Sequence, residues 1–155
     1  NHPLTWRQAN PYAAFHVSNI LIRRDVMKAH PFDETITRYG YEDVLLGRAL
    51  KDDGIRVVHA DNPVEFSRFD DNAHFLLKTE EGLQTLHDMR DALRGYSGVQ
   101  TLVERISRIG LAPLLRLAFR ITRGMLRRNL TGRKPSLTAF SVYRIGYYAM
   151  LCRND

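Results

Sequence analysis

The chain has 155 residues, of which 44% are apolar, so we expect a packed core and exclude disorder over most of its length. Its one cysteine, Cys152, excludes an intrachain disulfide and a cysteine-based metal site. The formal charge of +6 is unevenly spread: residues 1–104 hold 12 Lys/Arg and 16 Asp/Glu, and residues 105–154 hold 11 Lys/Arg and no acid.

The front of the chain is predicted to combine strands and helices. Aromatic and β-branched residues favour strands, while apolar residues at helical spacing before Gly54 favour a helix that ends there. In chain order we predict a loop over 1–14, a strand over 15–23, a helical turn over 25–29, a helix over 42–54 and a strand over 55–59.

The back of the chain is predicted to be entirely helical. The longest helix begins at Asn72, has Phe75, Leu83 and Met89 on its apolar side, and should end near Gly95. Three more helices are expected, over about 99–109, from Pro113 to about 128, and over 136–151. Pro113 suits a first helical turn.

Two segments of the front carry a family pattern: Phe15-His16-Val17-Ser18-Asn19-Ile20-Leu21-Ile22-Arg23-Arg24, and Pro31-Phe32-Asp33-Glu34 through Tyr39-Gly40-Tyr41-Glu42-Asp43. In order and spacing they resemble the acceptor-side half of family 2 glycosyltransferases. The resemblance implies an α/β fold, the second half of a GT-A domain over residues 1–70, followed by an all-helical C-terminal region over residues 71–155.

The resemblance also implies the catalytic residues: Asp43 as the base and Glu42 as the residue that holds the acceptor. Inverting glycosyl transfer needs a carboxylate that takes the proton of the attacking hydroxyl, and a helix N-terminus orients such groups. On spacing alone, Glu42 and Asp43 are better explained as helix-capping residues, and it is the surrounding family pattern that favours the catalytic interpretation.

Four further residues are candidates for substrate binding: Asn19, Tyr41, Trp6 and Arg23. Instead of binding substrate, Asn19 could close a bulge or cap a neighbouring element. Arg23 could be an ordinary surface arginine that binds no ligand. Asp33 and Glu34 should shape the turn after Phe32.

The sequence has no Asp-x-Asp motif and no glycine-rich phosphate loop, and its six histidines lack zinc-like spacing. Glu65 stands close to where many relatives place a metal-binding histidine, so either Glu65 replaces that histidine as an oxygen ligand or the metal is held only by the other half of the enzyme. We therefore expect that Mg²⁺ or Mn²⁺ in the intact enzyme is held mainly by a missing N-terminal half that binds the nucleotide sugar, that this chain holds no metal, and that it is inactive alone.

The basic region contains a strongly amphipathic segment. Arg116, Arg120, Arg123 and Arg127 fall on one side of the helix predicted from Pro113, and Leu114, Ala118, Ile121 and Met125 fall on the other. Such a helix suits an anionic membrane interface, and the alternative is that its apolar side packs on the helix from Asn72. No nucleic-acid-binding module accompanies the charge, so we expect no nucleic acid partner.

We therefore expect part of an inverting glycosyltransferase that moves a sugar from a nucleotide sugar to a glycan or lipid-linked acceptor, in bacterial surface polysaccharide synthesis. The alternative is a non-catalytic membrane-docking or interaction module. The expected location is cytoplasmic, peripheral to the inner face of the cell membrane. Uncovered strand edges and apolar faces lead us to expect self-association of the isolated chain.

Overall fold

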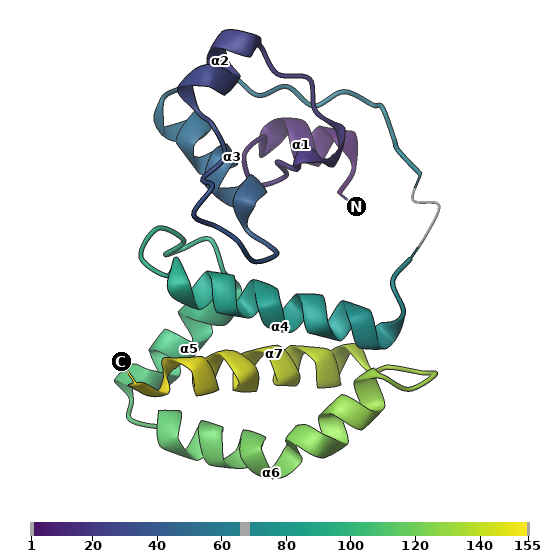
Figure 1. The fold of residues 1–155 in the computed structure, drawn as a ribbon, viewed down its shortest axis with the longest axis vertical. Helices are drawn as coiled ribbons and strands as arrows, with labels where there is room; N and C mark the ends of the chain where they lie inside the picture. The colour runs from purple at the N-terminus through teal and green to yellow at the C-terminus, as the bar shows by residue number, and fades with distance from the viewer. Residues whose placement is uncertain (1, 66–68, 155) are drawn as a thin grey trace. The chain divides into compact units, whose positions relative to one another are not determined.

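The computed structural model describes residues 2–65 and 69–154, and the chain divides into two compact units (Figure 1). The front unit consists of Asn1–Thr37 and Tyr41–Arg68. The helical unit consists of Arg38–Gly40 and Phe69–Asp155.

The front unit is built around one longer helix. Its elements are α1 (Leu4–Ala9), the 3₁₀ turn η1 (Val17–Asn19), α2 (Arg24–Ala29) and α3 (Glu42–Asp52). Phe15 is buried against Leu46 and Leu50 of α3. Partly buried residues complete this core: Tyr12, Val17, Ile22, Val26, Ile55 and Val57.

The predicted α/β GT-A half-fold is wrong, because residues 2–65 and 69–154 contain helices and no strand. Instead of the predicted strand, residues 15–23 contain the turn η1 with irregular backbone on both sides, and residues 55–59 are irregular. The loop predicted over 1–14 contains α1. The strand edges from which we expected self-association are therefore absent from the described residues.

Two causes explain the missing strands. Short apolar runs do not distinguish a strand from an irregular segment that fills a core, and here they pack on α3. Side chains also bond to carbonyl groups that a neighbouring strand would otherwise use: the Tyr12 hydroxyl donates to the Ile55 carbonyl at 2.9 Å, and the Gln8 amide to the His59 carbonyl at 3.3 Å.

The helical unit confirms the four helices predicted for the back of the chain. They are α4 (Asn72–Asp88), α5 (Gly98–Arg108), α6 (Ala112–Leu130) and α7 (Leu137–Leu151), followed by the 3₁₀ turn η2 (Cys152–Asn154). Side-chain oxygens of Asp71, Ser97 and Ser136 accept backbone N–H groups at the starts of α4, α5 and α7. The long helix ends at Asp88, earlier than predicted, and turns follow it.

Helix α7 packs against each of the other three helices of this unit (Figure 1). Tyr143 of α7 is fully buried with Leu76 of α4 and Phe119 of α6. Gly146 permits the close approach of α6 and α7, because a Cβ atom there would lie 2.3 Å from Cδ2 of Phe119.

The helical unit also contains a buried carboxylate, that of Glu80. The hydroxyl of Tyr143 and the guanidinium of Arg127 both donate to the carboxylate of Glu80, which is 9% exposed. The hydrogen bond with Tyr143 and the charge of Glu80 raise the pKa of Arg127. One buried carboxylate thus joins α4, α6 and α7: the guanidinium of Arg127 compensates its charge, and the Tyr143 hydroxyl adds a second hydrogen bond.

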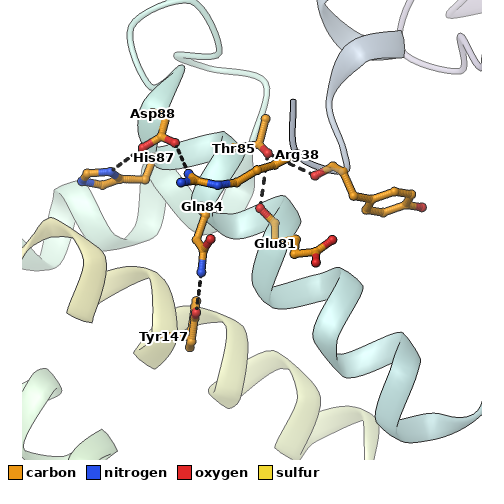
Figure 2. A network of polar contacts seen from close by, with 8 residues as sticks. Arg38, Glu81, Gln84, Thr85, His87, Asp88 and Tyr147 are labelled. Carbon is orange, nitrogen blue, oxygen red and sulfur yellow. Dashed lines mark hydrogen bonds and ion pairs between the residues drawn. The ribbon is translucent and has the colours of Figure 1, made fainter. Parts of the chain in front are cut away.

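Arg38 lies beside α4 (Figure 2), and Tyr39 and Gly40 contact the same helix. Arg38 pairs with Asp88, and the hydroxyl of Thr85 donates to the Tyr39 carbonyl at 3.1 Å. Gly40 has a φ of 104°, and a Cβ atom there would lie 3.2 Å from the Cα of Gly82. The Tyr-Gly pair of the family pattern therefore has a packing role within the helical unit.

Candidate functional site

Helix α3 begins directly at the two candidate carboxylates. Its N-cap residue, Tyr41, is half-buried and has a φ of 72° and a ψ of 0°. This left-handed conformation costs a non-glycine residue about 1–2 kcal/mol and persists only where the surrounding structure imposes it. Glu42 and Asp43 then occupy the first turn, where the positive end of the helix dipole favours acidic side chains.

Asp43 uses both carboxylate oxygens. Oδ1 accepts the backbone N–H of Val44 at 2.8 Å, and Oδ2 lies 2.8 Å from Nδ1 of His16. Because a carboxylate can only accept, Nδ1 carries the proton of this bond, and Nε2 is left as the proton acceptor of the neutral ring. The His16 side chain is 76% exposed and that of Asp43 is 23% exposed, so the pair is accessible from solvent.

The position of this pair follows from how Phe15 packs on α3. A Cβ atom at Gly47 would lie 3.1 Å from the Phe15 ring, so the absence of a side chain at 47 lets the ring approach the helix. Asp43 lies one turn before Gly47 on the same helical face. The residue after Phe15, His16, is thereby brought to Asp43.

Glu42 lines a small open cavity in the front unit. The cavity measures about 160 Å³, and its other lining residues include Pro31, Phe32, Ile36 and Leu45. The cavity walls are largely apolar, and Glu42 provides an acidic group at their edge.

Asp33 shapes the turn beside this cavity, as predicted. Its Oδ1 accepts the backbone N–H of Thr35 at 2.9 Å and the Thr35 hydroxyl at 2.6 Å. The hydroxyl hydrogen bond lowers the pKa of Asp33.

The remaining candidates have partners within the front unit. The amide of Asn19 donates to the Asn62 carbonyl at 2.9 Å and so ties two loops together. Arg23 pairs with Asp25, whose hydrogen bond raises the pKa of the guanidinium. Trp6, on α1, stacks on His2 with ring centroids 3.7 Å apart. Their predicted contacts with substrate stay predictions, and the structure gives Asn19 and Arg23 local structural roles.

The described residues contain no group of three or more His, Cys, Asp or Glu side chains that could hold a metal ion. Glu65 is exposed, and Phe66 beside it lies outside the described residues. The expectation that Mg²⁺ or Mn²⁺ is held mainly by a missing half stays a prediction.

His16 is the residue that sequence reasoning missed. Within the sequence, His16 is one of six histidines that lack zinc-like spacing, and nothing in that spacing sets it apart. One signal was available: His16 is a polar ring between Phe15 and Val17, two apolar residues of the family pattern. The pairing itself depends on two segments 27 residues apart, which no local pattern reports.

Comparisons with known proteins give no relative: no family model, curated protein or solved structure matches the chain. Within the part of the chain that the structure describes, no helix is both long and apolar enough to cross a membrane.

Proposed function

We propose that this chain carries the acceptor-side residues of an inverting glycosyltransferase, and that the His16–Asp43 pair is the proton acceptor of its reaction. The 2.8 Å contact between His16 Nδ1 and Asp43 Oδ2 is the observation that carries the proposal. A histidine oriented by a carboxylate is an arrangement suited to general base catalysis. The proposal rests on the motif and on this pair, and not on a sheet.

In the proposed reaction, the acceptor hydroxyl attacks the anomeric carbon of the donor sugar. The new C–O bond forms as the bond from that carbon to the nucleotide diphosphate breaks, and the diphosphate leaves with the electron pair. The hydroxyl proton passes to Nε2 of His16, and the carboxylate of Asp43 stabilises the imidazolium that results. Glu42 binds neighbouring hydroxyl groups of the acceptor.

The donor site belongs to another part of the enzyme in this proposal. The sequence has no Asp-x-Asp motif, so we place the nucleotide sugar, and Mg²⁺ or Mn²⁺ if the enzyme uses one, on an N-terminal half. The proposed acceptor is a glycan or a lipid-linked molecule, used in the synthesis of a bacterial surface polysaccharide. We place the enzyme in the cytoplasm, peripheral to the inner face of the cell membrane.

The test is an assay of sugar transfer by the intact enzyme, which contains both this chain and the proposed donor-binding half. Asp43→Asn and His16→Ala should each lower kcat about 10²- to 10⁴-fold, because each removes one member of the proton-accepting pair. Lys51→Ala, an exposed change on the same helix, is the control and should leave kcat unchanged.

Two results would contradict the proposal in different ways. Unchanged transfer by Asp43→Asn would remove the assignment of the base altogether. Loss of transfer by Asp43→Asn with normal transfer by His16→Ala would instead leave Asp43 as the base and make His16 dispensable.

A further inference from the structure

Helix α6 has apolar residues on two different sides. Phe119, Leu126 and Leu130 are buried in the core of the helical unit. A second set points away from that core, and we call it the outer stripe: Leu114, Leu117, Ile121 and Met125, which are 61%, 53%, 76% and 68% exposed.

The outer stripe is continuous along the helix. At 100° per residue its four members fall within about 80° of one another, and from Leu114 to Met125 they extend over about 16 Å. The small residues Ala118 and Gly124 flank the stripe on its two sides and are also exposed. Four large exposed apolar side chains in one row are more than scattered surface residues would provide.

The charge beside the outer stripe is entirely positive. Residues 105–154 contain 11 Lys/Arg and no acid. The guanidinium of Arg127 donates to Glu80, and that of Arg123 lies 5.7 Å from the centre of the Tyr147 ring. Both arginines therefore interact with residues of the helical unit itself. Arg120 and Arg128 are exposed. Arg120 directly precedes Ile121 of the stripe, and Arg128 lies about one helical turn beyond Met125.

The structure bears on the two alternatives left by the sequence, a membrane interface and a core contact. The side of α6 that packs on the unit carries Phe119, Leu126 and Leu130, and the side with Leu114, Ile121 and Met125 is turned to solvent. A core contact therefore does not account for the outer stripe. An apolar row bordered by arginines is the chemistry that an anionic lipid surface recognises.

We propose that α6 lies in the plane of an anionic membrane, with the outer stripe inserted among the acyl chains next to the headgroups. Arg120 and Arg128 extend their side chains to the lipid phosphates. The inference rests on the proposed membrane-peripheral location and names the surface and the partner chemistry that produce it. The occupant is lipid, because the positive surroundings match anionic headgroups and would oppose a second copy of the same basic helix.

The experiment uses the full chain and vesicles that sediment with bound protein. Vesicles of equal parts phosphatidylcholine and phosphatidylglycerol should bind the chain about tenfold or more tightly than vesicles of phosphatidylcholine alone, and salt should weaken this binding. Ile121→Asp with Met125→Asp should reduce the binding about tenfold or more. Arg120→Gln with Arg128→Gln should reduce binding only to the anionic vesicles.

A matched control separates the outer stripe from a general effect of added acid. Leu77→Asp with Leu137→Asp makes the same change in charge at two exposed residues of α4 and α7, outside the stripe. This control should bind clearly better than Ile121→Asp with Met125→Asp. Circular dichroism verifies that each variant keeps its helices.

Three outcomes would overturn the proposal: unchanged vesicle binding by Ile121→Asp with Met125→Asp, equal binding to both kinds of vesicle, or equal loss in the control. A concentration-dependent dimer that these stripe variants abolish, with no vesicle binding, would identify a second copy as the occupant. The assay involves no sugar transfer, so its failure is distinguishable from a failure of the proton-accepting role proposed for the His16–Asp43 pair.

Discussion

Gly47 lies against the ring of Phe15, and a Cβ atom at position 47 would come within 3.1 to 3.2 Å of Cβ, Cγ and Cδ1 of that side chain. These atoms lie at the base of a buried side chain, so they have little room to move. The same contact brings His16 to Asp43. The absence of a side chain at position 47 thus allows the packing of Phe15 that places His16 beside Asp43.

We predict that Gly47→Ala destabilises the front unit by about 1–3 kcal/mol, since the added methyl group overpacks the contact with Phe15. The displacement of Phe15 should also weaken the hydrogen bond between His16 and Asp43. Urea unfolding measures the first effect, and the NMR signal of the His16 ring nitrogens measures the second. Lys51→Ala is the control, and a Gly47→Ala variant with both properties intact would disprove the link.

A second prediction concerns Gly146, where a Cβ atom would lie 2.3 Å from Cδ2 of Phe119. Gly146→Ala should destabilise the helical unit by about 3 kcal/mol, because α6 and α7 must separate. Adding Phe119→Ala should cost less in this background than in the wild type, as expected for residues in contact. Gly124→Ala, at an open position of α6, should instead stabilise by up to about 1 kcal/mol. Equal effects at both glycines would contradict the packing.

The third prediction tests the Glu80 carboxylate. Tyr143→Phe removes one of its two donors, and should lower the free energy of unfolding by about 1–3 kcal/mol, because the group is buried. Tyr147→Phe is the comparison on the same helix. Its hydroxyl accepts from the Gln84 amide in a half-buried position, so its loss should cost under about 1 kcal/mol. Chemical denaturation measures both, and the reverse ranking would count against the network.

Alkaline pH supplies a fourth prediction. Burial raises the pKa of Tyr148 and of Tyr143, and the hydrogen bond with Glu80 adds to the shift of Tyr143. The unfolded chain therefore loses these phenolic protons first, at about pH 10, while the folded chain retains them. Stability from these groups is complete below that pH and declines above it. Tyr148→Phe should flatten the decline in a series of unfolding measurements, and parallel curves for wild type and variant would refute the account.

The helices of the back were predictable from sequence because their signals are local. Asp71, Ser97 and Ser136 cap the starts of three helices, and Pro113 stands in the first turn of α6. The start of α3 at Glu42 was predicted from the apolar residues that follow it at helical spacing, which is also a local signal. Each signal depends on neighbours within about one helical turn, so no tertiary information is needed to interpret it.

The structure of the front unit could not be predicted from local sequence, because a short apolar run fits both a strand and an irregular segment that packs in a core. Phe15, Val17 and Ile22 suit a strand by composition, but a strand exists only when another strand accepts its hydrogen bonds. The tertiary structure packs these residues on α3 and gives the Ile55 carbonyl to Tyr12.

The sequence by itself determined the carboxylates at the start of α3, the helices of the back, and the separation of apolar from basic residues on α6. The tertiary structure alone decided that His16 meets Asp43, and that α6 buries Phe119 while Ile121 stays in solvent. Both outcomes depend on segments distant in sequence, because a packing contact is selected by the shapes of both partners. Gly47 and Gly146 make those contacts possible by leaving space for a ring from elsewhere in the chain.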